Sequence, residues 1–320
     1  MKITIGTFNL NNLFSRYNFK ASIKSLKKGG TVVEYVFEDE ENFKIRKFQG
    51  KLIKPKNQKD TEKIAARILE MGADILAVQE VEDINILKKF NKDFLGSKAY
   101  KYVTLIEGND PRFIDVGLLS NYPLGGITSW QHAVYDNETR EIFSRDLLQA
   151  EILNEKRTKT LFTLFVTHLK SNFISYTSPD ADKQRVKNNQ KRLKQSEVIG
   201  RIIEDQTRPD SKYILVGDMN DSADSLFLKG FSDYTGINLH NALENMQETG
   251  KMNKTKYPPG NIFWTHRYRV STGNYAYNLY DQIWISPALT GKLTGSWVAR
   301  RKSVTGDGSD HDPVWIELNL

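Results

Sequence analysis

The sequence predicts one α/β or α+β domain of layered sheets, and three features favour this fold class. Short apolar segments typical of strands open and close the chain, with amphipathic helical segments between them. No internal repeat, low-complexity tract or distinct linker divides the sequence into two cores, although its 320 residues would suit one large domain or two ordinary ones. The hydrophobic content of 39%, with sixteen Phe, fourteen Tyr and five Trp, argues against disorder. We therefore predict that residues 1–320 form a single domain.

The chain begins with an expected strand over residues 2–9, which ends in a polar run. Residues 14–60 are rich in charge and loop-forming residues, and we interpret them as an insertion on the surface of the fold. Asp60 or Thr61 then caps a helix that Gly72 ends. The apolar face of this helix is expected to contain Ile64, Ala65, Ile68 and Leu69.

A strand over residues 75–78 is apolar on both faces, which is typical of a strand buried between two layers. It ends at Gln79 and Glu80, and an amphipathic helix over residues 82–90 follows it. Two pairs of strands come next, at residues 102–106 with 116–119 and at residues 147–153 with 161–167.

The second half of the chain contains a long expected helix over residues 183–205. Its apolar stripe consists of Val186, Leu193, Ile199 and Ile203. Another face carries Lys183, Lys187, Lys191 and Lys194, and this face is either a phosphate-binding surface or an ordinary solvated one. Residues 221–262 mix short helical and loop signals, and the remaining expected strands are 213–216, 282–285 and 314–318.

The net charge of +7 and the pI of about 9.2 favour a polyanionic partner such as nucleic acid or an anionic membrane surface, although many basic proteins bind neither. The absence of cysteine excludes disulfides, thiolate catalysis and Cys-based zinc or iron–sulfur sites. No apolar run is long enough to span a membrane. Residues 3–5 alternate like a strand and not like a signal peptide, so we expect a cytoplasmic or, if a leader has been trimmed, a secreted protein.

Polar residues stand repeatedly at the ends of the expected strands. Each one alone would be an ordinary loop residue, but close-packed strands can bring their ends together on one rim, where active sites often lie. The recurring residues are Asn9, Glu80, His168, Asp218 with Asn220, Asp281, and Asp310 with His311.

These residue types suit the hydrolysis of phosphate esters. Carboxylate and amide oxygens are ligands that Mg²⁺, Mn²⁺ or Ca²⁺ prefers, whereas no Cys or HExxH-type helix supports a zinc site. A divalent ion neutralises developing charge while a base activates water and an acid protonates the leaving oxygen. The sequence has no Gly-rich P-loop, so nucleotide triphosphate hydrolysis of that type is not supported.

Seven short segments, in order along nearly the whole chain, resemble motifs of one known superfamily. They are Thr7-Phe8-Asn9, Val78-Gln79-Glu80, residues 115–120 (DVGLLS), residues 167–171 (THLKS), Gly217-Asp218-Met219-Asn220, residues 280–283 (YDQI) and Ser309-Asp310-His311. The sequence thereby resembles the endonuclease/exonuclease/phosphatase superfamily, which contains pancreatic-type DNase, abasic-site endonucleases, sphingomyelinases and inositol-phosphate phosphatases. It is most similar to bacterial nuclease-type members with the THLKS motif.

The resemblance implies a four-layered α/β sandwich, in which two packed, mostly antiparallel sheets are flanked by helices. It implies that Glu80 is the principal metal ligand, with Asn9 and Asp310 near the same Mg²⁺, and that Mn²⁺ or Ca²⁺ are substitutes. Asp218 would orient or deprotonate the attacking water, and Asn220 would hold the phosphate.

The resemblance also assigns the histidines. His311, paired with Asp281, would contact the phosphoryl oxygens or act as a base. His168 would be a general acid or a phosphate contact, oriented by Asp115. The candidates for substrate or phosphate binding are Asn9, Asp115, Arg145 and Lys170. Asp312 has no fixed role in the family pattern, and we expect it to be structural.

The leading hypothesis from the sequence is therefore a Mg²⁺-dependent phosphodiester hydrolase that acts on nucleic acid. One alternative is a phosphodiesterase or phosphatase that acts on a lipid or a small-molecule phosphate ester, like sphingomyelinases or inositol phosphatases. Another is an inactive module that only binds nucleic acid, although the intact motifs argue against it. The sequence does not distinguish DNA from RNA, or endonuclease from exonuclease action.

Overall fold

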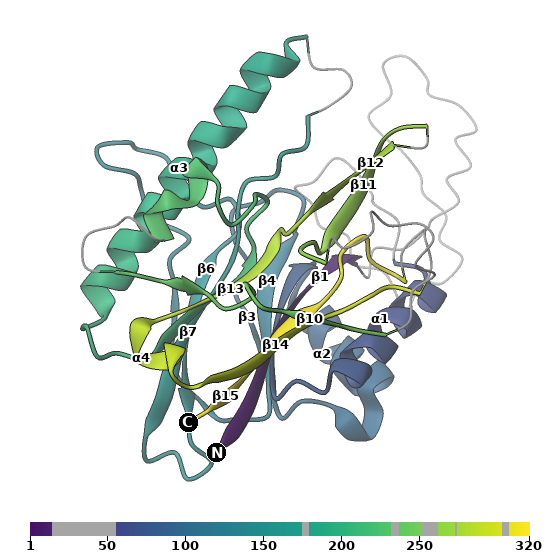
Figure 1. Cartoon of the computed structure of the whole chain (residues 1–320), viewed down its shortest axis with the longest axis vertical. Helices are drawn as coiled ribbons and strands as arrows, with labels where there is room; N and C mark the ends of the chain where they lie inside the picture. The colour runs from purple at the N-terminus through teal and green to yellow at the C-terminus, as the bar shows by residue number, and fades with distance from the viewer. Residues whose placement is uncertain (15–55, 175–178, 232–236, 251–261, 273, 303–306) are drawn as a thin grey trace, which may run out of the picture.

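The computed structural model in Figure 1 describes residues 1–14, 56–174, 179–231, 237–250, 262–272, 274–302 and 307–320. Two β-sheets pack face to face, and helices cover their outer faces, which confirms the expected four-layered sandwich. The two chain termini are hydrogen-bonded to each other, with Met1 N donating to Leu320 O at 2.7 Å. They lie at the end of the sandwich opposite to the β11–β12 hairpin (Figure 1).

The first sheet has seven strands in the order β10-β14-β15-β1-β2-β4-β3. Two neighbouring pairs, β1 with β2 and β10 with β14, are parallel, and the other pairs are antiparallel. Its strands are β1 (Lys2–Leu13), β2 (Ile75–Val81), β3 (Tyr102–Leu105), β4 (Asp115–Ser120), β10 (Gln247–Thr249), β14 (Leu293–Ala299) and β15 (Val314–Asn319).

The second sheet has six strands in the order β5-β6-β7-β8-β13-β9, and only β7 and β8 run parallel within it. Its strands are β5 (Leu124–Ser129), β6 (Leu147–Leu153), β7 (Thr160–His168), β8 (Tyr213–Asp218), β9 (His240–Asn241) and β13 (Asp281–Ile285). A separate hairpin consists of β11 (His266–Ser271) and β12 (Asn274–Asn278).

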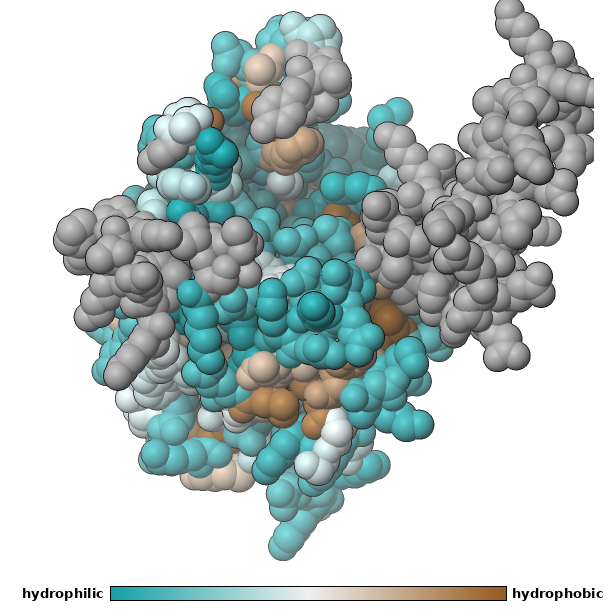
Figure 2. Space-filling view, turned by 90° about the vertical axis from the view of Figure 1, so that its right-hand side faces the viewer, coloured by the Kyte–Doolittle hydropathy of each residue, from teal (hydrophilic) through white to brown (hydrophobic). Residues whose placement is uncertain are grey.

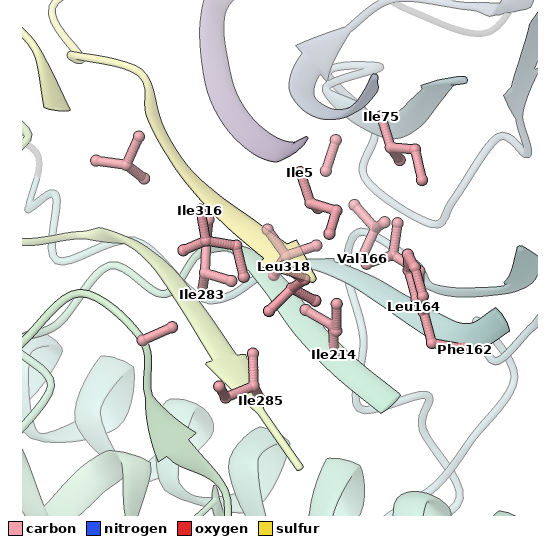
Figure 3. Close-up of a cluster of buried hydrophobic side chains, with 14 of the residues drawn as sticks. Ile5, Ile75, Phe162, Leu164, Val166, Ile214, Ile283, Ile285, Ile316 and Leu318 are labelled. Carbon is pink, nitrogen blue, oxygen red and sulfur yellow. The ribbon is translucent and has the colours of Figure 1, made fainter. Parts of the chain in front are cut away.

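Three apolar cores hold the four layers together. The central core lies between the sheets and contains Ile5, Ile75, Val166, Ile214 and Ile283, each fully buried (Figure 3). Burial of each such side chain contributes about 1.5–3 kcal/mol. The outer cores lie under α1 (Gln58–Met71) with α2 (Ile84–Leu95), and under α3 (Ala181–Gln206) with the 3₁₀ turn η3 (Leu226–Phe231). The other short helices are η2 (Gly96–Lys98) and α4 (Pro287–Thr290).

Helix α1 begins earlier than expected, because Asn57 and not Asp60 or Thr61 is the N-cap. Gly72 ends the helix in the left-handed conformation, as expected. Leu69 was expected on the buried face, but its side chain is 43% exposed. It borders a groove between α1 and α2 on the outer face of the helix layer. Figure 2 shows that this side of the molecule is mostly hydrophilic, with small groups of hydrophobic residues.

Helix α3 follows Asp180, whose side chain accepts a hydrogen bond from Lys183 N. Ile199 and Ile203 are buried as expected, but Val186 is 54% exposed. The reason is that the first turns of α3 project beyond the sheet (Figure 1).

The expected strand pairs β3–β4 and β6–β7 are confirmed, whereas β5, β14 and the β11–β12 hairpin were not expected. The predicted surface insertion at 14–60 lies almost wholly outside the described residues. No helix in the described ranges has the length and apolar character needed to cross a membrane.

Candidate active site

Backbone pairing in the six-stranded sheet brings three of the predicted site residues together. Asp218 ends β8 and is in register with His168 of the parallel strand β7. On its other side Asp218 is in register with Asp281, the first residue of the antiparallel strand β13. The register of the sheet alone therefore places these three side chains at one edge.

The turn after β8 depends on a glycine. Gly217 has φ +144°, and a Cβ atom there would lie 1.9 Å from Thr167 O, so no other residue fits between β7 and β8. Asn220 has φ +53°, and its backbone N–H donates to Asp218 Oδ1 at 2.9 Å. Its side chain donates to Leu169 O at 3.2 Å. This tight turn holds the Asp218 carboxylate in one orientation.

Asn9 connects the two sheets at the site. Its Nδ2 donates to Asp218 Oδ2 at 2.9 Å, and its backbone oxygen accepts a hydrogen bond from Ser309 Oγ at 2.7 Å. The same Ser309 hydroxyl accepts from His311 N at 3.0 Å. The strand β1 of one sheet thus positions both the Asp218 carboxylate of the other sheet and the loop that carries His311.

Glu80 leaves the regular strand geometry of β2. Its φ is +60°, and the register between β1 and β2 shifts here. Glu80 Oε2 accepts from Asn12 N at 3.0 Å, and Oε1 lies 3.4 Å from Asn9 Nδ2. Asn9 Oδ1 accepts from Asn11 N at 2.9 Å, so Asn9 turns its amide nitrogen toward Glu80. A role for Asn9 as a metal ligand stays a prediction.

His311 and Asp281 form the predicted pair. His311 Nδ1 and Asp281 Oδ2 are 2.6 Å apart, and both side chains are buried. Burial lowers the pKa of His311, but the carboxylates of Asp281 and Asp218 outweigh it and raise that pKa to about 10. The imidazole is therefore positively charged at neutral pH, and its Nε2 is 3.9 Å from Asp218 Oδ2.

His168 has the opposite protonation state. Burial and the nearby positive charge of Arg145 hold its pKa well below the usual range, so the imidazole is neutral. Its Nε2 is 3.5 Å from Asp218 Oδ2. Asp115 was expected to orient His168, but His168 Nδ1 has no hydrogen-bond partner among the described residues. Asp115 Oδ1 accepts a hydrogen bond from Gly108 N, and the role of Asp115 in orienting His168 stays a prediction.

The carboxylates at this edge form a set that fits a hard divalent cation. Burial, and then the carboxylate of Asp310, raise the pKa of Glu80, and burial raises the pKa of Asp218. Carboxylate oxygens are the ligands that a hard divalent cation prefers. Among the described residues, two groups of three side chains have ligand atoms within 4.8 Å of one another: His266 with Asp310 and His311, and Asp218 with Asp281 and His311. Glu80 belongs to neither group.

His266 is a site residue that the sequence reasoning missed. Its Nε2 is 3.5 Å from Asp310 Oδ2, its ring centroid is 4.7 Å from that of His311, and it stacks on Tyr280 with centroids 5.2 Å apart. A signal was present, because the chain has only five histidines and His266 precedes a Tyr-rich segment. With His168 and His311, three of the five lie at this site.

Helix α3 fixes the segment that follows His168. Gln195 Oε1 accepts from Lys170 N at 2.9 Å, and an Arg192 side-chain N–H donates to Lys170 O at 2.9 Å. Arg145, which is buried, donates to Leu169 O at 2.6 Å. The predicted phosphate-binding residues Lys170 and Arg145 therefore lie beside His168, on the side away from His311 and Asp281.

Asp312 has the structural position that we expected. Its fully buried carboxylate accepts hydrogen bonds from the side chains of Arg67, Arg300 and Arg301 at 2.7, 3.3 and 3.0 Å. Arg67 also donates to His311 O at 3.0 Å, and Arg301 to Asp310 O at 2.7 Å. This cluster anchors the backbone of the active-site loop to α1 and to the residues after β14.

The site therefore collects most of the predicted residues, namely Asn9, Glu80, His168, Asp218, Asn220, Asp281, Asp310 and His311.

Similar folds occur in proteins of known structure. An AP endonuclease from Archaeoglobus fulgidus has a TM-score of 0.60 at 16% identity, over 99% of this chain and 100% of that one. The mannosyl-6-phosphatase Bt3783 of Bacteroides thetaiotaomicron has a TM-score of 0.56 at 14% identity, over 99% and 100% of the two chains. TDP2 from C. elegans has a TM-score of 0.55 at 14% identity, over 100% of this chain and 76% of that one.

These identities indicate a shared fold. No curated protein matches the chain in sequence. The model of the endonuclease/exonuclease/phosphatase family, however, matches residues 6–311, which include the eight predicted residues that the site collects. The chain belongs to this family of phosphate ester hydrolases, whose members generally depend on a divalent metal ion.

Proposed function

We propose that this protein is a divalent-metal-dependent phosphodiesterase whose substrate is nucleic acid. The observation that carries the proposal is the position of the Asp218 carboxylate between two imidazoles of opposite charge state. The neutral His168 lies 3.5 Å away on one side, and the charged His311 lies 3.9 Å away on the other. A base flanked by a cationic proton donor suits the displacement of an alkoxide from phosphorus.

In this proposal Asp218 orients the attacking water and accepts its proton as the water oxygen bonds to phosphorus. Its raised pKa, which results from burial, makes it a stronger base than an exposed carboxylate. His311 supplies a proton from Nε2 to the leaving oxygen as the bond from that oxygen to phosphorus breaks. Asp281 keeps the imidazole charged and oriented through the 2.6 Å contact at Nδ1.

The remaining residues hold the phosphoryl group. His168 and Asn220 adjoin Asp218 and would donate hydrogen bonds to the phosphoryl oxygens. Lys170 and Arg145 lie beyond His168 on the β7 side and make the adjoining surface positive. Glu80 and Asp310 would hold the metal ion, and His266 stands beside Asp310. When bound, a divalent cation there supplies positive charge to the non-bridging oxygens.

Nucleic acid is favoured over smaller esters by the charge of the protein. The net charge of +7 attracts a polyanion, and several cations lie close to the site. A substrate panel tests the proposal: plasmid DNA, RNA, sphingomyelin, inositol phosphates and a chromogenic phosphodiester, each with Mg²⁺ and with EDTA. We expect Mg²⁺-dependent cleavage of DNA or RNA that weakens steeply with added salt. If the protein hydrolyses only the lipid or small-molecule esters, nucleic acid is not its substrate and the proposal is wrong.

A further inference from the structure

Positive charge is concentrated beside His168, on the side away from Asp281. Arg145 is almost fully buried, and its guanidinium is 3.5 Å from Asp110, the only carboxylate within 4.0 Å of it in the described ranges. Arg145 Nε has no hydrogen-bond partner among those residues. A buried cation with so few partners is costly, so a further negative charge near it would stabilise the protein.

The Asp110 carboxylate is not available to Arg145 alone. Arg112 binds the same carboxylate through two side-chain hydrogen bonds, Nε to Oδ1 at 3.0 Å and a terminal nitrogen to Oδ2 at 2.9 Å. The Arg112 side chain is 55% exposed, so solvent reaches this end of the cluster. One carboxylate is therefore shared by two guanidinium groups.

Two lysines add to this excess of positive charge. Lys191 of α3 donates from Nζ to Ser144 Oγ at 3.0 Å, next to Arg145, and Lys170 Nζ is 3.4 Å from Ser171 O. Neither lysine forms an ion pair with a carboxylate of the described part of the chain. Burial, and then the charge of Arg145, lower the pKa of both ammonium groups, that of Lys170 to about 8.

We propose that Lys170, Lys191, Arg112 and Arg145 form a second anion-binding subsite, which takes the phosphate next to the scissile one in a nucleic acid strand. Positive charges held together in a partly buried position repel one another and lower the stability of the free protein. An anion that binds between them neutralises this repulsion and accepts hydrogen bonds from them. Arg145 donates to Leu169 O, and Lys170 follows Leu169, so both cations are held by the segment directly after His168 and an anion bound there lies beside the reacting phosphate. This inference rests on the proposed nuclease function and narrows its substrate to strands with at least two phosphates.

Dinucleotides with one internal phosphodiester, carrying no terminal phosphate, a 5′-phosphate or a 3′-phosphate, test the subsite. We expect the wild-type protein to cleave one phosphorylated form with a kcat/KM about tenfold higher than the unphosphorylated form. Lys191→Gln removes one charge and keeps the length of the side chain, so this preference should fall several-fold. Lys212→Gln is a matched control, because Lys212 is half-buried just before β8, at the opposite end from Asp218. Equal cleavage of all three dinucleotides, or an equal preference in the three proteins, overturns the subsite.

Calorimetric titration with inorganic phosphate in EDTA measures the subsite without catalysis. We expect wild type and Lys212→Gln to bind phosphate, and Lys191→Gln to bind it several-fold more weakly. If no dinucleotide is cleaved but phosphate binding depends on Lys191, the nuclease proposal fails and the anion site stands. If dinucleotides are cleaved without preference and phosphate binding does not depend on Lys191, the subsite fails and the nuclease proposal stands.

Discussion

The buried carboxylate of Asp312 provides a sharp test of how this site is built. Asp312 is 0% exposed, and the side chains of its three arginine partners are each 6% exposed or less. The substitution Asp312→Asn keeps the size of the side chain and removes its charge. Three buried guanidinium groups then lose their shared counter-ion. The new NH₂ group takes the place of the oxygen that accepts from Arg300, so two hydrogen-bond donors face each other there.

The magnitude follows from the contacts. Removing one partner of a buried ion pair costs about 3–5 kcal/mol, because the remaining charge stays buried without compensation. Each arginine here keeps backbone acceptors, including Ala299 O for Arg67 and Thr265 O for Arg301, which limits the loss. We therefore expect the free energy of unfolding to fall by about 4 kcal/mol at pH 7.

Urea denaturation followed by circular dichroism measures this change. The control is Asp93→Asn, which breaks the exposed Lys89–Asp93 pair at 2.8 Å and should leave the free energy of unfolding nearly unchanged, because solvent screens this pair. Since Arg67 and Arg301 also hold the backbone of His311 and Asp310, Asp312→Asn should lose activity well below its melting temperature. A destabilisation under about 1 kcal/mol would refute the reasoning that the cluster depends on this charge.

Three further predictions concern the chemistry. Asp218→Asn should lower kcat about 10²–10⁴-fold with an unchanged circular dichroism spectrum, and a variant that keeps wild-type kcat would exclude Asp218 as the base. Lys170 is charged below its pKa of about 8 and neutral above it, so KM for an oligonucleotide should rise as pH passes through about 8. In Lys170→Gln the KM should be high at every pH, and a wild-type inflection that persists in this variant would assign it to another group. Mg²⁺ should raise the melting temperature of the wild-type protein after EDTA treatment but not that of Glu80→Gln, and an equal shift in both would remove Glu80 from the metal site.

The layers of the fold were predictable because the central strands are apolar on both faces. Residues 75–78 and 213–216 are runs that only a strand between two packed layers accommodates, and the structure buries all of them. The convergence of polar residues was predictable for a related reason. Neighbouring strands of one core end at the same side of the sheet. Asp218 and Asp281 therefore lie side by side once their two strands pair in this register.

Other features depend on contacts that a local pattern does not contain. Val186 fits a helical stripe, but the first turns of α3 extend past the sheet and its side chain is 54% exposed. His266 enters the site through a single β-bridge to His311, across 45 residues of sequence. Asp115 is the first residue of a family motif, and its carboxylate accepts a hydrogen bond from the backbone of Gly108, which the motif does not indicate. Motif spacing identifies residues in the same region, whereas tertiary hydrogen bonds decide which of them meet.

The three consecutive residues Asp310, His311 and Asp312 show how stability and chemistry are connected in this site. Their side chains diverge: Asp312 turns into the arginine cluster, His311 toward Asp281, and Asp310, which is 50% exposed, toward His266. Arg67 and Arg301 bind both the Asp312 carboxylate and the backbone oxygens of the two preceding residues. A catalytic imidazole needs this kind of rigid support, because small errors in position reduce the rate strongly. The buried charge of Asp312 therefore fixes the geometry of His311 through these arginines, and its removal should reduce activity even in a variant that remains folded.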